Sequence, residues 1–273
     1  MSTSHPISLV VTDLDGTVWQ TDDQIPDVVI SAIGELKRRE IPLLVATGRR
    51  LASARDPFAR IGIALPSVVL NGALGVDLTD GSRFHRAPFT TEEATAVLAG
   101  FRSVGLAPVI YVDNPRFDVF LDPNPSTNPG HITTLGATAA TDDLSRVVAE
   151  EAVLGFSMIG VPHRDGAAAE EAVGPIAEVH LDRSLDYDDR ASFTVAPRGQ
   201  SKWDGVLAYC AVHGLDANQV LALADGPNDL ELLDEAAVSL VPEVAHPEAL
   251  ARADHIIPPA ADGGWAAVLD HLP

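Results

Sequence analysis

The chain has 273 residues, 46% of them apolar and 21% charged, which is typical of a soluble globular protein with room for one or two domains. Its 39 acidic and 18 basic residues give a net charge of −21, which disfavours binding to nucleic acids and to anionic membranes. No apolar run approaches the ~20 residues that span a bilayer, and no basic stretch precedes the first one, so we expect neither a membrane anchor nor a signal peptide. The single cysteine, Cys210, cannot form an internal disulfide, which fits a cytoplasmic location.

Short apolar runs, each ending in a polar residue, recur in the first and last parts of the chain. They are apolar throughout instead of alternating, which predicts strands buried on both faces of a parallel sheet. These runs occupy residues 9–13, 43–48, 68–72 and 220–226, and a further strand is expected at residues 237–241. Helical patterns separate them at residues 27–40, 50–61 and 202–213. This alternation predicts an α/β fold with a Rossmann-like, doubly wound parallel sheet.

The pattern changes in the middle of the chain. The elements expected here are a helix at 91–104, strands at 108–112, 117–121, 154–161 and 176–181, and a helix between the last two strands. Residues 113–131 are dense in Pro, Asn and Asp, which predicts a partly irregular segment. The first pattern resumes after residue 196. We therefore expect a core domain of residues 1–87 and 197–273, with an inserted α/β domain at residues 88–196.

Polar residues follow four of the predicted strands closely: Asp13, Thr47, Asn71 and Asp225. Ligands of doubly wound sheets bind beyond the carboxyl ends of the strands. We therefore expect these four side chains to lie on one rim of the sheet.

The first of them opens the sequence Asp13-Leu14-Asp15-Gly16-Thr17. Two carboxylates so close to the end of a buried strand repel each other, and a bound cation would offset that repulsion. Gly16 allows a sharp turn that presents backbone N–H groups to an anion. The alternative is an Asp-rich turn without a function, since Asp-Gly is frequent in turns.

A second acidic pair, Asp225 and Asp229, directly follows the strand pattern near residue 220. Together with Asp13 and Asp15 it would bring four carboxylates to one point. Hard oxygen ligands in this number suit Mg²⁺. The nine histidines and one cysteine show no spacing that would favour a softer metal.

Two further places in the sequence suit an anion at this rim. Thr47, followed by Gly48 and Arg49, can offer a hydroxyl and N–H groups to phosphoryl oxygens, although Thr47 also fits a helix N-cap. Lys202 falls in the first turn of a helix that Ser201 could cap, where a cation is unfavourable. That misfit favours a functional role for Lys202, next to a carboxylate and a transferred phosphoryl group. The alternative is a solvated lysine on the surface.

Together these residues resemble the haloacid dehalogenase superfamily. The matches, in motif order, are Asp13, Asp15 and Thr17 in DxDxT, then Thr47, then Lys202, then the acidic pair Asp225 and Asp229. The large insertion between the second and third motifs, with NGA at 71–73 and DGGWAAVLDHL at 262–272, is similar to the class IIB, Cof-type branch. The resemblance implies a core carrying an inserted cap domain of the C2B type.

The resemblance also implies a phosphohydrolase mechanism. Asp13 is then the nucleophile that forms an aspartyl phosphate, and Asp15 is the general acid and base. Thr47 and Lys202 then position the phosphoryl group and neutralise its charge. The implied ligands of Mg²⁺ are Asp13, Asp15 through its backbone carbonyl, and Asp225, with Asp229 close by. The implied substrate contacts are Thr17, Gly48, Arg49, Asn71 and Asn228.

The inserted domain of this branch selects the substrate, which implies a small phosphorylated metabolite, often a sugar phosphate, as the partner of a monomer or small homo-oligomer. Asn114 and Arg116 are candidates for contacts with the leaving group, and an ordinary surface loop is the alternative there. Two other functions remain open: a phosphomutase with the same intermediate, and a non-catalytic regulatory protein on this fold. A nucleotide-dependent dehydrogenase is disfavoured because no GxGxxG follows the first strand.

Overall fold

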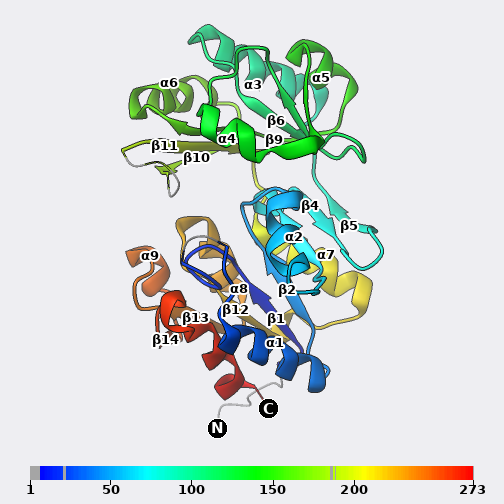
Figure 1. Ribbon diagram of the computed structural model, residues 1–273, viewed down its shortest axis with the longest axis vertical. Helices are drawn as coiled ribbons and strands as arrows, with labels where there is room; N and C mark the ends of the chain where they lie inside the picture. Colours follow the sequence, from blue (N-terminus) through cyan, green and yellow to red (C-terminus); the bar gives the residue numbers. More distant parts are fainter. Residues whose placement is uncertain (1–6, 21–22, 185–186, 188, 273) are drawn as a thin grey trace. The chain divides into compact units, whose positions relative to one another are not determined.

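The computed structural model describes residues 7–20, 23–184, 187 and 189–272. Contacts within the chain divide it into two compact units (Figure 1). Unit 1 comprises Met1–Arg86 and Ser201–Pro273, and unit 2 comprises Ala87–Gln200. Unit 2 is therefore continuous in sequence, whereas unit 1 is assembled from two segments.

Unit 1 is built on an eight-stranded sheet with the strand order β14-β13-β12-β1-β2-β3-β4-β5. The strands are β1 (Leu9–Thr12), β2 (Leu43–Ala46), β3 (Ser67–Val69), β4 (Leu74–Val76), β5 (Arg83–Arg86), β12 (Val220–Leu223), β13 (Val238–Pro242) and β14 (His255–Ile257). The six strands from β14 to β3 are parallel, and β4 and β5 add an antiparallel edge. The predicted α/β fold with a doubly wound parallel sheet is confirmed.

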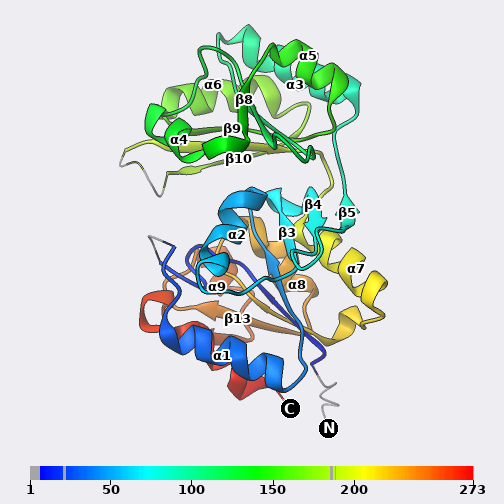
Figure 2. The same cartoon turned by 45° about the vertical axis from the view of Figure 1, so that its right-hand side comes forward.

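Helices cover this sheet (Figure 2). They are α1 (Asp27–Arg38), α2 (Leu51–Ala59), α7 (Lys202–His213), α8 (Leu230–Glu235) and α9 (Pro247–Leu250). Short 3-10 segments are η1 (Leu70–Gly72), η3 (Ala217–Gln219), η4 (Pro227–Asp229), η5 (Ala260–Asp262) and η6 (Gly264–His271). Apolar side chains of α7, α8 and α9 pack with those of β1, β2 and β12 in one core, and α1 packs beside η6. This burial stabilises the strands whose ends carry the polar residues of interest.

Unit 2 contains a six-stranded sheet with the order β10-β11-β9-β6-β7-β8. The strands are β6 (Val109–Val112), β7 (Val119–Leu121), β8 (Ala139–Thr141), β9 (Val153–Val161), β10 (Glu178–Arg183) and β11 (Ala191–Ala196). The helices are α3 (Thr91–Ser103), α4 (Pro129–Thr134), α5 (Leu144–Glu150) and α6 (His163–Val173), with the 3-10 segment η2 (Gly136–Thr138). Apolar side chains of α3, α5 and α6 pack against the sheet in a separate core. Within the described parts of both units, no helix is both long and apolar enough to cross a bilayer.

Candidate active site

Four neighbouring strands of unit 1 end at the same edge of the sheet. Because β12, β1, β2 and β3 lie side by side and run parallel, the residues that follow them meet at that edge. Asp225, Asp13, Thr47 and Asn71 are those residues, one or two positions beyond the strand ends. The structure thus brings these four residues onto one rim.

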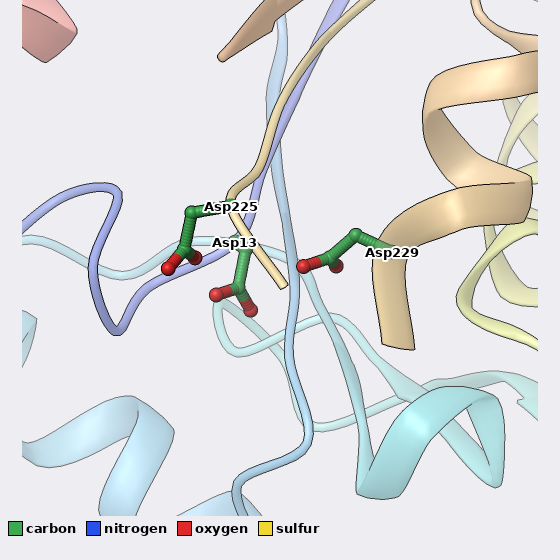
Figure 3. A group of neighbouring side chains, drawn as sticks. All are labelled: Asp13, Asp225 and Asp229. Carbon is green, nitrogen blue, oxygen red and sulfur yellow. The ribbon is translucent and has the colours of Figure 1, made fainter. Parts of the chain in front are cut away.

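Three carboxylates converge at this rim (Figure 3). One oxygen atom from each of Asp13, Asp225 and Asp229 lies within 4.8 Å of the other two. Asp13 is only 6% exposed and Asp229 is fully buried, so both charges are largely removed from water. Buried carboxylates this close to one another are unfavourable unless cations lie among them.

Lys202, the first residue of α7, supplies one such cation. Its side chain is 1% exposed, and its Nζ donates hydrogen bonds to Asp13 Oδ1 at 2.8 Å and to Asp229 Oδ1 at 2.5 Å. Burial lowers the pKa of Lys202, but the two carboxylates outweigh burial and leave that pKa raised. The ammonium group is therefore charged, and it contacts a carboxylate that lies 189 positions away in the sequence.

Lys202 compensates only part of the negative charge at this point. Three carboxylates and one ammonium group leave a formal charge of −2. Asp225 accepts a hydrogen bond from Thr17 Oγ1 at 3.1 Å, and no basic side chain among the described residues forms an ion pair with it. Burial, with Asp229 nearby, raises the pKa of Asp225 to about 7. Burial also raises the pKa of Asp13, an effect that Lys202 opposes and the neighbouring carboxylates reinforce.

Gly16 allows the chain beyond β1 to pass close to Asp225. Its φ of +75° is one that other L-residues rarely adopt, and a Cβ atom here would lie 2.1 Å from Asp225 Oδ2. The backbone N–H groups of Thr17 and Val18 donate to the carbonyl oxygen of Leu14, which closes the turn. The turn that the sequence predicts at Gly16 is therefore present, and only glycine fits it without displacing Asp225.

Asp15 does not join the three converging carboxylates, so the expectation that four would meet at one point is wrong. Its side chain pairs with Arg49, whose Nε donates to Oδ2 at 2.6 Å and whose Nη2 donates to Oδ1 at 2.5 Å. Trp19 Nε1 donates a further hydrogen bond to Oδ1 at 3.0 Å. These donors stabilise the charge of Asp15. Among the three converging carboxylates, that charge would mainly meet repulsion.

Thr47 is almost fully buried at the end of β2, at 1% exposure. Its hydroxyl oxygen accepts a hydrogen bond from the backbone N–H of Arg49 at 3.2 Å. Helix α2 begins at Leu51 with Arg50 as its N-cap, so the alternative reading of Thr47 as the helix cap is wrong.

Asn71 in η1 and Asn228 in η4 contact each other at the rim. Asn228 Nδ2 donates to Asn71 Oδ1 at 3.0 Å, and Asn71 adopts a left-handed backbone with φ of 54°. A Cβ atom on Gly48 would lie 2.9 Å from the same Asn71 oxygen, so Gly48 leaves room for this amide. The structure thus groups three of the residues that the resemblance assigns to substrate binding.

Comparisons with known proteins identify the family. Residues 10–269 match the family model of the haloacid dehalogenase-like hydrolases. The chain belongs to this family. Phosphoglycolate phosphatase from Methanopyrus kandleri is 24% identical over 265 residues, covering 97% of either chain. The predicted resemblance is therefore confirmed.

Solved structures of haloacid dehalogenase-like hydrolases share this fold. The phosphatase BT1666 from Bacteroides thetaiotaomicron has a TM-score of 0.78 at 18% identity, with 99% of this chain and 97% of that chain covered. The subclass IIB sugar phosphatase BT4131 has a TM-score of 0.72 at 18% identity, with coverage of 97% and 98%. The likeness extends over both units, including the inserted α/β domain.

Haloacid dehalogenase-like hydrolases use a divalent metal, and the donor set of this chain fits such an ion. The three converging carboxylates offer hard oxygen atoms, and a charge of +2 would cancel the formal charge of −2 that Lys202 leaves. Asp225 has a raised pKa and no ion-pair partner among the described residues, so a cation bound there would stabilise its ionised form.

Sequence reasoning did not find three residues that hold the site of this haloacid dehalogenase-like hydrolase. Trp265, fully buried in η6, donates from Nε1 to Thr12 Oγ1 at 2.8 Å, and that hydroxyl in turn donates to the carbonyl oxygen of Asp13 at 2.6 Å. Trp19 and Asp23 contact Arg49. Of these three residues, only Trp265 lies in a stretch that the sequence analysis mentions, DGGW at 262–265. No feature of the sequence predicts its contact with Thr12 in β1.

Proposed function

We propose that the chain is a magnesium-dependent phosphohydrolase that cleaves small phosphomonoesters, sugar phosphates among them, through an aspartyl phosphate on Asp13. The observation that carries this proposal is the surroundings of Asp13. It lies between a buried lysine and two other carboxylates, at the edge where parallel sheets bind ligands. Few structural roles require so many buried charges in one place.

The chemistry follows from the placement of the side chains. Asp13 Oδ1 accepts from Lys202, which leaves Oδ2 to attack phosphorus and form the new O–P bond. The bond between phosphorus and the leaving oxygen breaks, and Asp15, which must enter this step protonated, donates its proton to that oxygen. A water molecule then attacks the aspartyl phosphate while Asp15 takes a proton from it, which releases phosphate and restores Asp13. Thr47 and Lys202 position and partly neutralise the phosphoryl oxygens.

The side chains of Asp13, Asp225 and Asp229 and the backbone carbonyl of Asp15 are the groups proposed to hold Mg²⁺. Bound there, the ion would neutralise charge that develops on the phosphoryl oxygens. Thr17 keeps the Asp225 carboxylate in place through its hydroxyl hydrogen bond, and Gly226 N–H holds Asp229 Oδ2 at 3.0 Å.

The substrate class rests on the relatives and on unit 2. The matched proteins are named as phosphatases of phosphoglycolate and of a sugar phosphate, which are both small phosphomonoesters. Unit 2 is proposed to act as the cap domain that selects among such compounds. Within it, Asn114 Nδ2 donates to Glu151 at 3.1 Å and the Arg116 guanidinium lies 4.9 Å from the Phe117 ring centre.

The test is phosphate release from a panel of phosphorylated metabolites, measured with Mg²⁺ and with EDTA. Wild-type protein should release phosphate from several sugar phosphates only when Mg²⁺ is present. Asp13→Asn should lower turnover by roughly three or more powers of ten, because the covalent intermediate can no longer form.

Asp56→Asn is the matched control, since Asp56 is an exposed carboxylate of the same unit that forms an ion pair with its neighbour Arg55. It should retain wild-type activity. A flat panel in the presence of Mg²⁺, or near-normal turnover by Asp13→Asn, would rule the proposal out. Transfer of the phosphoryl group back to the sugar, without free phosphate, would identify a phosphomutase instead.

A further inference from the structure

Arg49 lies at the centre of a second charged cluster on the rim. Besides its two hydrogen bonds to Asp15, its Nη2 pairs with Asp23 Oδ1 at 2.7 Å, and its Nη1 donates to the carbonyl oxygen of Ser53 at 3.2 Å. Its guanidinium carbon lies 5.1 Å from the ring centre of Trp19. Trp19 also donates to Asp15, so arginine and tryptophan hold the same carboxylate together.

The hydrogen-bonding capacity of Arg49 is nearly used up by these partners. A guanidinium group has five N–H donors, and four of them point to Asp15, Asp23 and Ser53. A phosphoryl group could bind through two parallel N–H groups only by displacing one of these carboxylates. This arrangement argues that Arg49 acts on Asp15 and not on the phosphate.

Asp15 needs such a partner because of the charges around it. Its side chain is 29% exposed, and Asp13 and Asp225 are close enough to interact with it electrostatically. Without a cation, like-charge repulsion would favour conformers in which the Asp15 carboxylate points away from Asp13 and into solvent. Two N–H groups of Arg49 fix both oxygens of this carboxylate, which restricts it to one orientation.

We propose that Arg49 and Asp23 are positioning residues that fix the orientation of the general acid Asp15 at the rim, with Trp19 as their support. This inference rests on the proposed phosphohydrolase function. Asp23 pairs with Nη2 of Arg49, the same nitrogen that donates to Asp15 Oδ1, and the aromatic face of Trp19 limits the remaining freedom of the guanidinium group. None of these three residues needs to touch the substrate.

The proposal predicts a dependence on the leaving group. Proton donation by Asp15 accelerates departure of a basic alkoxide, whereas p-nitrophenolate leaves readily without a proton. Arg49→Gln should therefore lower kcat/KM roughly 100-fold for the sugar phosphate that the wild-type protein hydrolyses fastest, but less than about fivefold for p-nitrophenyl phosphate. The inhibition constant of inorganic phosphate should stay within about twofold of the wild-type value.

Three further variants sharpen the test. Arg49→Lys keeps the charge but only one donor group, and it should recover part of the loss with the sugar phosphate. Asp23→Asn should show the same leaving-group pattern with a several-fold loss. In an Asp15→Asn background, Arg49→Gln should cause no further loss, because both changes remove the same step. Arg55→Gln, an exposed arginine of α2, is the control and should behave as wild type.

The outcomes separate this inference from the proposed function. If the wild-type protein hydrolyses nothing, the function itself fails. If wild-type protein is active but Arg49→Gln weakens phosphate inhibition and lowers kcat/KM equally for both substrates, Arg49 binds the phosphoryl group and the positioning role is wrong. Full additivity with Asp15→Asn, or unchanged kinetics in Arg49→Gln, would also overturn it. Because p-nitrophenyl phosphate turnover reports a folded site, loss from misfolding is recognised directly.

Discussion

Asp225 links the charge of the site to pH. Burial and Asp229 raise its pKa from 3.8 to about 7, so the folded protein binds a proton that the unfolded chain has released between those values. The stability that this proton contributes is present below about pH 4 and is lost as the pH rises through about 7. We expect the melting temperature of metal-free protein, measured in EDTA, to fall across this window, and Asp225→Asn to flatten that part of the profile.

Magnesium should oppose this loss, because it binds the ionised carboxylates and competes with the proton. The rise in melting temperature on adding Mg²⁺ should therefore be larger at pH 8 than at pH 5, and Asp225→Asn should abolish most of it. A shift of equal size at both pH values would contradict the placement of the ion at Asp225.

Gly16 allows a sharp test of the same contact. In Gly16→Ala the new Cβ would meet Asp225 Oδ2 at 2.1 Å, so we expect the affinity for Mg²⁺ to fall about tenfold or more by calorimetry. Gly62→Ala is the matched control: Gly62 has a φ of +73°, but nothing lies within 4 Å of its Cβ position. Both variants should lose about 1–2 kcal/mol of stability from backbone strain, and only the first should lose metal affinity. Equal affinities in the two variants would show that the contact does not matter.

Helix α3 illustrates how single elements depend on their ends. Thr90 caps it, with its Oγ1 accepting from Glu93 N–H at 3.2 Å and its own N–H donating to Glu93 Oε2 at 2.9 Å. Thr90→Ala should cost about 0.5–2 kcal/mol of unfolding free energy in urea denaturation. Thr95→Ala, in the middle of the same helix, removes a threonine without removing a cap and should cost nothing. A loss of similar size in both variants would contradict the capping role.

The elements that could be predicted from sequence are those whose burial requires a continuous apolar run. β1, β2 and β12 are buried along their whole length, and the predicted runs identify them. β5, with the sequence RFHR, and β14, at the other edge of the sheet, are partly exposed and carry no such run. These two strands form because they pair with β4 and β13, so their own sequences do not predict them.

The same distinction applies to the site. Asp13, Thr47 and Asp225 could be placed together because parallel neighbouring strands end at one edge, whatever the side chains do. The orientation of Asp15 could not be predicted, because it depends on which cation reaches its carboxylate. The structure shows that Arg49 pairs with this carboxylate and that Trp19 donates a hydrogen bond to it. The hydrophobic periodicity of the sequence does not predict either contact.

For the whole molecule, the net charge of −21 predicts a response to salt. Repulsion among unpaired carboxylates favours the expanded unfolded chain, and salt screens it. The melting temperature in EDTA should therefore rise by a few degrees between about 10 mM and about 500 mM NaCl. A constant or falling melting temperature would show that the acidic groups are already balanced locally.

The interruption of unit 1 by unit 2 has a consequence during synthesis on the ribosome. Leu9 in β1 pairs with Val220 in β12, so the central strand waits for more than 200 further residues before its second neighbour emerges. Unit 2 is continuous, and its last strand, β11, ends at Ala196, before β12 begins at Val220. The converging carboxylates of Asp13 and Asp225 can therefore meet only after every strand of unit 2 has been synthesised.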